Sequence, residues 1–235
     1  MSDGLFCYRI NNMNTIIFDI ETIPVDFDSL DAVQQEYLLK FSESEEEIEK
    51  TKEQLALWAP TNRIVAIGML SVELEKGAVY YQIQEKQADD FEEDGIKYVS
   101  GSEKEILEKF WKAISTANKF VTFNGRGFDC PVLMMRSAIH QIKPTKNLLP
   151  NRYYTDQHID LLDQLQFYGA TRKFNLDFYC KTFGIESPKA GGVTGHDVKP
   201  LFEAGEYEKI ARYCAGDLFA TRELYLRWRD YLNMR

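Results

Sequence analysis

Two carboxylates, Asp19 and Glu21, follow the apolar run at residues 16–18 and are separated only by Ile20. The run is typical of a buried central strand, in which alternate side chains leave the same face. Asp19 and Glu21 are therefore expected to point together, with Ile20 in the opposite layer. Two like charges there are costly unless a cation lies between them, and hard oxygen ligands suit Mg²⁺ or Mn²⁺. The alternative is a strand end with two solvated acids.

A third carboxylate, Asp129, lies in the segment TFNGRGFDCPVL, residues 122–133. A strand is expected to end at Asn124, followed by a glycine-bracketed turn, with Asp129 at the head of the next helix. As an alternative, Asp129 is only the N-cap of that helix, with Pro131 in the first turn. Asn124 and its neighbouring glycines could equally form only a tight turn.

The segment RYCAGDLFATREL, residues 212–224, contains Tyr213 and Asp217 four positions apart. On a helix this spacing places both side chains on one face. Cys214 and Leu218 lie close to that face, so the carboxylate borders a partly apolar environment. The alternative is a surface aspartate beside a tyrosine that only packs.

The other elements are predicted from hydrophobic periodicity, turn residues and capping signals. Strands are expected at 64–74 and 78–84, as a hairpin, and at 119–125; helices at 102–115, 127–141 and, as one or two helices, 206–232; short amphipathic segments at 158–169 and 174–185; and an acidic loop at 85–95. Ser102 and Glu105 form a capping box. This order predicts one α/β domain, residues 1–235, with a mixed sheet whose first strand is central. Active sites on open sheets gather at the ends of such strands, where Asp19 and Glu21 lie.

A strongly acidic stretch at about 28–57 is expected to be a helical insertion, with a capping box at Ser42–Glu45. Residues 26–54 contain ten acids and three lysines, a balance of −7 out of the formal net charge of −9, so the other residues carry only −2. We expect a solvated helix face; excluding substrate or binding a protein partner are the alternatives. The charge argues against a long duplex-binding surface, but not against a short single-stranded end held mainly through metals.

Composition predicts a globular chain: 44% of its 235 residues are hydrophobic. No apolar run approaches the length of a membrane span, and the first residues lack a signal-peptide pattern. Four cysteines, at positions 7, 130, 180 and 214, show no CxxC spacing and are expected to be reduced. These features predict a cytoplasmic protein.

FDIET, then NxxxFD, then YxxxD, in this order on an α/β chain, resemble the DEDD superfamily of 3′→5′ exonucleases in its tyrosine-containing branch. The likeness is greatest to predicted exonucleases related to the proofreading domain of family B DNA polymerases. It implies a ribonuclease H-like mixed sheet flanked by helices. It also implies two divalent ions, Mg²⁺ or Mn²⁺, held by four carboxylates: Asp19, Glu21, Asp129 and Asp217.

In such an enzyme Tyr213 would orient the attacking water, with His196 a minor alternative as base. Thr22, Asn124, Arg126 and Phe128 would border the 3′-terminal nucleotide, although Phe128 could equally pack in the core. The resemblance implies release of nucleoside monophosphates from a nucleic acid 3′ end and favours DNA, whereas the small charge outside residues 26–54 favours a single strand. An RNA 3′-end trimming enzyme and a catalytically silent nucleic-acid-binding module of the same fold are the alternatives.

Overall fold

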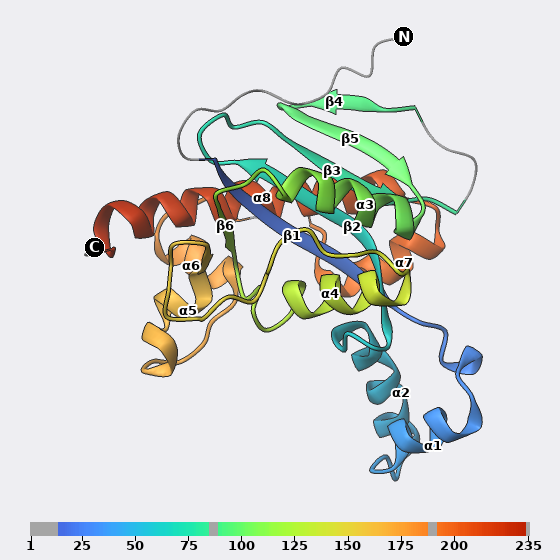
Figure 1. Ribbon diagram of the computed structural model, residues 1–235. Coiled ribbons are helices and arrows are strands. Elements are labelled where there is room, and N and C mark those ends of the chain that lie inside the picture. Colours follow the sequence, from blue (N-terminus) through green and yellow to red (C-terminus); the bar gives the residue numbers. More distant parts are fainter. Residues whose placement is uncertain (1–13, 85–88, 188–191, 234–235) are drawn as a thin grey trace.

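The computed structural model describes residues 14–84, 89–187 and 192–233. Their centre is a mixed sheet of seven strands in the order β4-β5-β3-β2-β1-β6-β7 (Figure 1). The strands are β1 Thr15–Pro24, β2 Asn62–Ser71, β3 Gly77–Gln82, β4 Phe91–Glu93, β5 Ile96–Gly101, β6 Lys119–Thr122 and β7 His158–Asp160. β1 pairs antiparallel with β2 and parallel with β6, so the first strand is interior, as predicted.

Helices cover both faces of this sheet (Figure 1). The α-helices are α1 Ala32–Leu39, α2 Glu45–Gln54, α3 Glu103–Ile114, α4 Asp129–Ile139, α5 Leu161–Leu165, α6 Leu176–Thr182, α7 Val198–Glu203 and α8 Tyr207–Tyr231; 3₁₀ turns are η1 Phe27–Ser29, η2 Leu55–Leu57, η3 Phe167–Gly169 and η5 Gly195–Asp197. The segment predicted as one or two helices at 206–232 is the single helix α8. None of the helices in the described parts of the chain has the length and apolarity to cross a bilayer.

Alternate side chains of β1 belong to two separate apolar cores, one on each face of the sheet. Phe18 and Ile20 pack with α3 and α4 on one face, whereas Ile17 and Ile23 pack with α8 on the other. Because side chains alternate along a strand, Asp19 and Glu21 share the α8 face with Ile17. The expectation that Ile20 points into the opposite layer is confirmed.

A buried ion-pair network joins the α3–α4 layer to the sheet. Glu103, the first residue of α3, accepts hydrogen bonds from the Ile64 backbone N–H at 2.9 Å and from the Arg136 guanidinium at 2.6 and 2.7 Å. Burial alone would raise the pKa of Glu103, but the hydrogen bonds from Arg136 and Ile64 lower it below its usual value. One carboxylate thus ties together β2, α3 and α4. The predicted capping box of Ser102 and Glu105 at the start of α3 is confirmed.

Three strands differ from the sequence prediction. The expected loop at 85–95 contains β4 in its described part, β5 follows it, and β7 lies in a segment expected to be only amphipathic. β4 and β7 are three residues long and lie at the sheet edges, so pairing with a neighbouring strand defines them and no periodic pattern marks them. The capping box at Ser42–Glu45 is also wrong, because α2 begins at Glu45 and its box is formed by Ser44 and Glu47.

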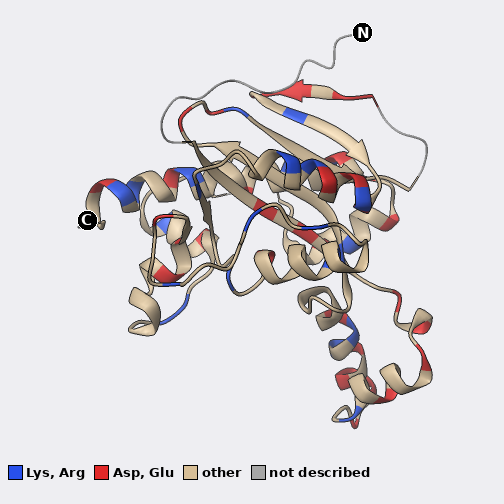
Figure 2. Cartoon of the chain, in the orientation of Figure 1, with Lys and Arg blue, Asp and Glu red and all other residues tan. Residues whose placement is uncertain are grey.

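Residues 26–57, here called the arm, project from the body of the molecule beside the end of β1 (Figure 1). Acidic residues are frequent along the arm, above all in α2 (Figure 2). The root is anchored: the Leu55 side chain is buried, and the Thr22 hydroxyl donates to the Ala56 carbonyl at 2.8 Å. Neither α1 nor α2 has a buried residue, so side-chain caps stabilise these helices in place of a core.

Candidate active site

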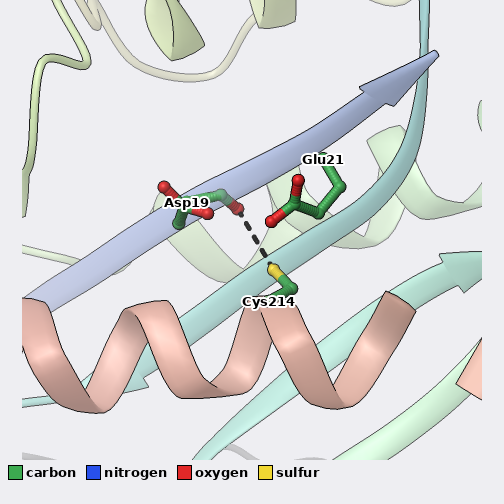
Figure 3. A group of neighbouring side chains, drawn as sticks. All are labelled: Asp19, Glu21 and Cys214. Atoms are coloured by element: carbon green, nitrogen blue, oxygen red, sulfur yellow. Dashed lines mark hydrogen bonds between the residues drawn. The ribbon is translucent and has the colours of Figure 1, made fainter. Parts of the chain in front are cut away.

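Asp19 and Glu21 point from β1 toward α8 (Figure 3). Asp19 is paired across the sheet with Gly68 of β2. A Cβ atom at Gly68 would lie 2.8 Å from both Cys214 Sγ and Leu218 Cδ1. The missing side chain therefore allows α8 to pack close to the sheet beside the two carboxylates.

Asp129, at the start of α4, approaches this pair at the edge of β1 that pairs with β6. Its Oδ1 atom accepts a hydrogen bond from the Ile20 backbone N–H at 3.1 Å. That N–H is available because the pairing of β6 with β1 stops at Ile17 and Val121. The alternative that Asp129 is the N-cap of α4 is wrong, because Phe128 occupies that position and Asp129 is the first helical residue.

Tyr213 and Asp217 lie one turn apart on α8, and both line the cleft over β1. Burial raises the pKa of the Tyr213 phenol far above its usual value, and the negative charges of Glu21, Asp217 and Asp19 raise it further, as does a hydrogen bond with Asp217. The phenol consequently stays protonated at neutral pH. It can donate to a carboxylate and orient a water, but it cannot act as a phenolate base.

Burial and the charges of neighbouring carboxylates raise the pKa values of Asp19, Glu21 and Asp129. Burial is the main cause for Asp19, followed by the charges of Asp129, Asp217 and Glu21. The pKa of Glu21 is raised by burial and then by Asp217 and Asp129. Burial also raises the pKa of Asp129, to about 7. The three sequence motifs thus supply one mutually repelling cluster, as expected for residues that share a cation.

The donor atoms of this cluster fit hard divalent cations. Oxygens of Asp19 and Glu21 and the sulfur of Cys214 lie within 4.8 Å of one another. Burial and then the charges of Asp19 and Glu21 raise the pKa of the Cys214 thiol well above its usual value. The neutral thiol faces the Asp19 carbonyl oxygen at 3.8 Å and is a weak ligand (Figure 3). Carboxylate oxygens are left as the ligands, and they suit Mg²⁺ or Mn²⁺.

The four residues predicted to bind substrate do not share one environment. Thr22 and Phe128 line the cleft, although the Thr22 hydroxyl already donates to the Ala56 carbonyl at the root of the arm. Asn124 has a φ of 62°, so this asparagine provides the left-handed residue of the turn before α4. The Arg126 guanidinium points inward, where it donates to the Pro150 carbonyl at 2.7 Å and lies 4.0 Å from Asp163.

Asp160 and Cys214 are parts of the site that sequence reasoning did not single out. The Asp160 carboxylate accepts the backbone N–H groups of Asn124 and Arg126, both at 2.9 Å, and so orders the turn that presents Asp129. The sequence offered no signal for this role, because no periodic pattern marks β7 and it adjoins β6 only in the folded sheet. Cys214 was expected only to border the helix face that Tyr213 and Asp217 share.

Asp19, Glu21 and Asp217 line a cleft of about 1280 Å³. One wall comes from the segment after β6, from α6 and from the η5–α7 region, which contributes His196 and Lys199. The opposite wall comes from the arm. An extended chain end could therefore enter between the arm and the body and reach the carboxylates.

Residues 57–234 match a family model described as "predicted 3′-5′ exonuclease related to the exonuclease domain of PolB". The chain belongs to this family. As a member of this family of predicted 3′-5′ exonucleases, it is a phosphodiester hydrolase. The match contains Asp129, Tyr213 and Asp217, whereas β1 and most of the arm precede it. A comparison with curated proteins found no match.

Among solved structures, the exonuclease is similar to the family B DNA polymerase from the hyperthermophilic archaeon Pyrobaculum calidifontis. The TM-score is 0.59 at 14% sequence identity, and the similarity covers 93% of this chain and 25% of the polymerase. The chain thus spans about a quarter of that polymerase's length, and the likeness concerns the fold. Together with the family match, it identifies the mixed seven-stranded sheet with flanking helices as ribonuclease H-like, as predicted.

Proposed function

We propose that the protein is a metal-dependent 3′→5′ exonuclease of the tyrosine-containing DEDD branch. Its substrate is the 3′ end of single-stranded DNA, from which it releases nucleoside monophosphates. The observation that carries the proposal is the convergence of four carboxylates, from β1, α4 and α8, with a phenol that stays protonated. A module that only bound nucleic acid would gain nothing from a buried cluster of acids that repel phosphate.

Each part of the site has a defined task in phosphodiester hydrolysis. Two Mg²⁺ or Mn²⁺ ions, when bound by the four carboxylates, supply Lewis-acid stabilisation of charge on the scissile phosphate. Tyr213 donates its O–H to Asp217, which leaves the phenol oxygen free to accept a hydrogen bond from a water and so orient it for attack. Ile20 holds the Asp129 carboxylate through its backbone N–H. Phe128 offers its ring to the terminal base, because aromatic side chains stack on bases without regard to sequence.

The preference for a short single strand is supported by charge. Outside residues 26–54 the chain carries a formal charge of only −2, without a basic tract of five or more residues. A surface of this kind suits a few nucleotides held at the metal site better than a long duplex. The relation of the family to the exonuclease domain of PolB favours DNA over RNA.

The test uses end-labelled single-stranded DNA, single-stranded RNA and a recessed duplex, each with a free or a blocked 3′ end. We expect Mg²⁺- or Mn²⁺-dependent, distributive release of mononucleotides from free 3′ ends, fastest on single-stranded DNA and slower as salt rises. EDTA should abolish the release while circular dichroism shows an intact fold. Shortening from the 5′ end, or internal cuts in blocked substrate, would refute the assignment. Equal rates on DNA and RNA would show that the sugar is not recognised, and absence of cleavage would favour the silent module.

A further inference from the structure

The arm forms one wall of the active-site cleft, although the family match begins only at its last residue. Residues of η1 and of α2 line the cleft opposite the exonuclease body. The wall is held in place, since Leu55 is buried and the Thr22 hydroxyl and the Asn62 amide both donate to the Ala56 carbonyl. A nucleic acid that reaches the carboxylates therefore passes along the inner face of the arm.

The inner face carries groups that suit one nucleic acid strand. Phe27, Lys50 and Lys52 all line the cleft, and the Lys52 ammonium lies 5.4 Å from the centre of the Phe27 ring. The same ammonium is 2.8 Å from a Glu49 oxygen. An aromatic ring next to ammonium groups can stack on a base while the cations contact the adjoining phosphates.

The same wall also carries four acids: Asp26, Asp28, Glu49 and Glu53. Carboxylates repel phosphate. Lys50 and Lys52 can offset this repulsion for the phosphates of one strand only. A duplex brings a second row of phosphates into the cleft, and this wall carries four acids against only two lysines, one of which is already paired with Glu49. The penalty falls on the complementary strand.

We propose that the inner face of the arm selects against duplexes. Phe27, Lys50 and Lys52 hold the single strand that enters the cleft, and the four acids of the same wall reject its complement. This inference rests on the proposed exonuclease function and adds to it the element that decides strandedness.

The test compares two variants that raise the formal charge by the same amount. The inner-face variant is D26N/D28N/E49Q/E53Q, and the outer-face control is E36Q/E43Q/E45Q/E46Q, four acids of the arm that do not line the cleft. Asparagine retains the ability of Asp26 to cap η1. Neither variant touches the Asp31 or Ser44 caps of the arm helices.

Affinity is measured by fluorescence anisotropy at low salt in EDTA, with a labelled 12-nucleotide DNA strand and with the same strand annealed to its complement. Hydrolysis of both substrates is measured in Mg²⁺. We expect the inner-face variant to lose about tenfold of the wild-type preference for the single strand, the effect of four charges about one Debye length from a phosphate row. The outer-face control should bind both substrates better by the same factor and keep the wild-type preference.

A preference that is unchanged in the inner-face variant, or reduced equally in both variants, would overturn the inference. In either case normal release of mononucleotides by the wild type would leave the exonuclease proposal intact. If the wild type shortens no 3′ end, the proposed function fails and the inference fails with it. The two failures are therefore distinguishable in one set of measurements.

Discussion

Asp129→Asn should stabilise the metal-free protein, and more so at alkaline than at acid pH. Asparagine has nearly the same shape as aspartate and keeps the Oδ1 acceptor for the Ile20 N–H. What the substitution removes is a charge that the folded state accommodates poorly. Burial raises the pKa of Asp129 from its ordinary value of 3.8 to about 7, with the charges of Asp160 and Asp217 adding to the effect.

The size and sign of the stabilisation by Asp129→Asn follow from proton linkage. A carboxyl group whose pKa is higher in the folded than in the unfolded protein favours folding below the unfolded pKa, and this contribution is lost as pH rises through the folded pKa. Between pH 3.8 and about 7 the free energy of unfolding of the wild type should fall by about 1.4 kcal/mol per pH unit through Asp129 alone. The stabilisation by Asp129→Asn should thus be at most about 4 kcal/mol at pH 8, and about 3 kcal/mol less at pH 5.

Urea denaturation in EDTA at pH 5 and pH 8 measures this difference directly. Glu36→Gln, which removes an exposed acid from α1, is the matched control and should leave stability nearly unchanged at both values. Adding Mn²⁺ at pH 8 should stabilise the wild type more than the variant, because the variant lacks one carboxylate ligand. If Asp129→Asn destabilises the metal-free protein at pH 8, or acts equally at the two pH values, burial and the neighbouring carboxylates do not raise the pKa of Asp129 as argued.

Three further substitutions test the site and its support. Tyr213→Phe should slow hydrolysis by ~10²–10⁴-fold with unchanged affinity for substrate and metal, whereas Tyr207→Phe on the same helix should have the wild-type rate; an undiminished rate for the first variant would make His196 the next candidate. Gly68→Ala should lower the free energy of unfolding, measured in urea, by about 1–3 kcal/mol and should lower kcat more than affinity, because its Cβ would displace α8 from the sheet. A wild-type kcat would show that α8 does not need this close approach. Arg136→Met should lower the free energy of unfolding by about 3–5 kcal/mol at pH 7, and this loss should shrink once acid protonates Glu103, whose pKa is lowered by its hydrogen bonds against the effect of burial. A loss of stability that does not depend on pH would argue against an ion pair.

Much of the site was predictable because its short-range geometry is set by the backbone repeat. Alternation along a strand places Asp19 and Glu21 on one face, and four positions on a helix place Tyr213 and Asp217 together. The central place of β1 followed from its continuous apolar run. These relations span a few residues, and the period of a strand or helix determines them before any tertiary contact forms.

Convergence of the motifs was decided by tertiary structure. Asp129 is 109 residues from Ile20, and their hydrogen bond exists because β6 stops short and leaves one N–H of β1 free. Gly68 places α8 against the carboxylates, a requirement that appears only when β2 and α8 are packed. No periodic pattern encodes either contact.

Arg126 and the arm also show that residue type and composition do not predict tertiary contacts. The resemblance predicted that Arg126 borders the 3′-terminal nucleotide, yet the folded chain turns its guanidinium toward the Pro150 carbonyl and Asp163. The acidic composition of the arm predicted solvated helices, and α1 and α2 indeed lack a core. That one face of the arm forms a wall of the cleft depends on how its root packs on β1, and that packing joins residues from separate elements. Sequence therefore determined the chemical groups and their local spacing, whereas long-range packing decided which of them meet, because a side chain's partners across the fold are set by the positions of whole strands and helices.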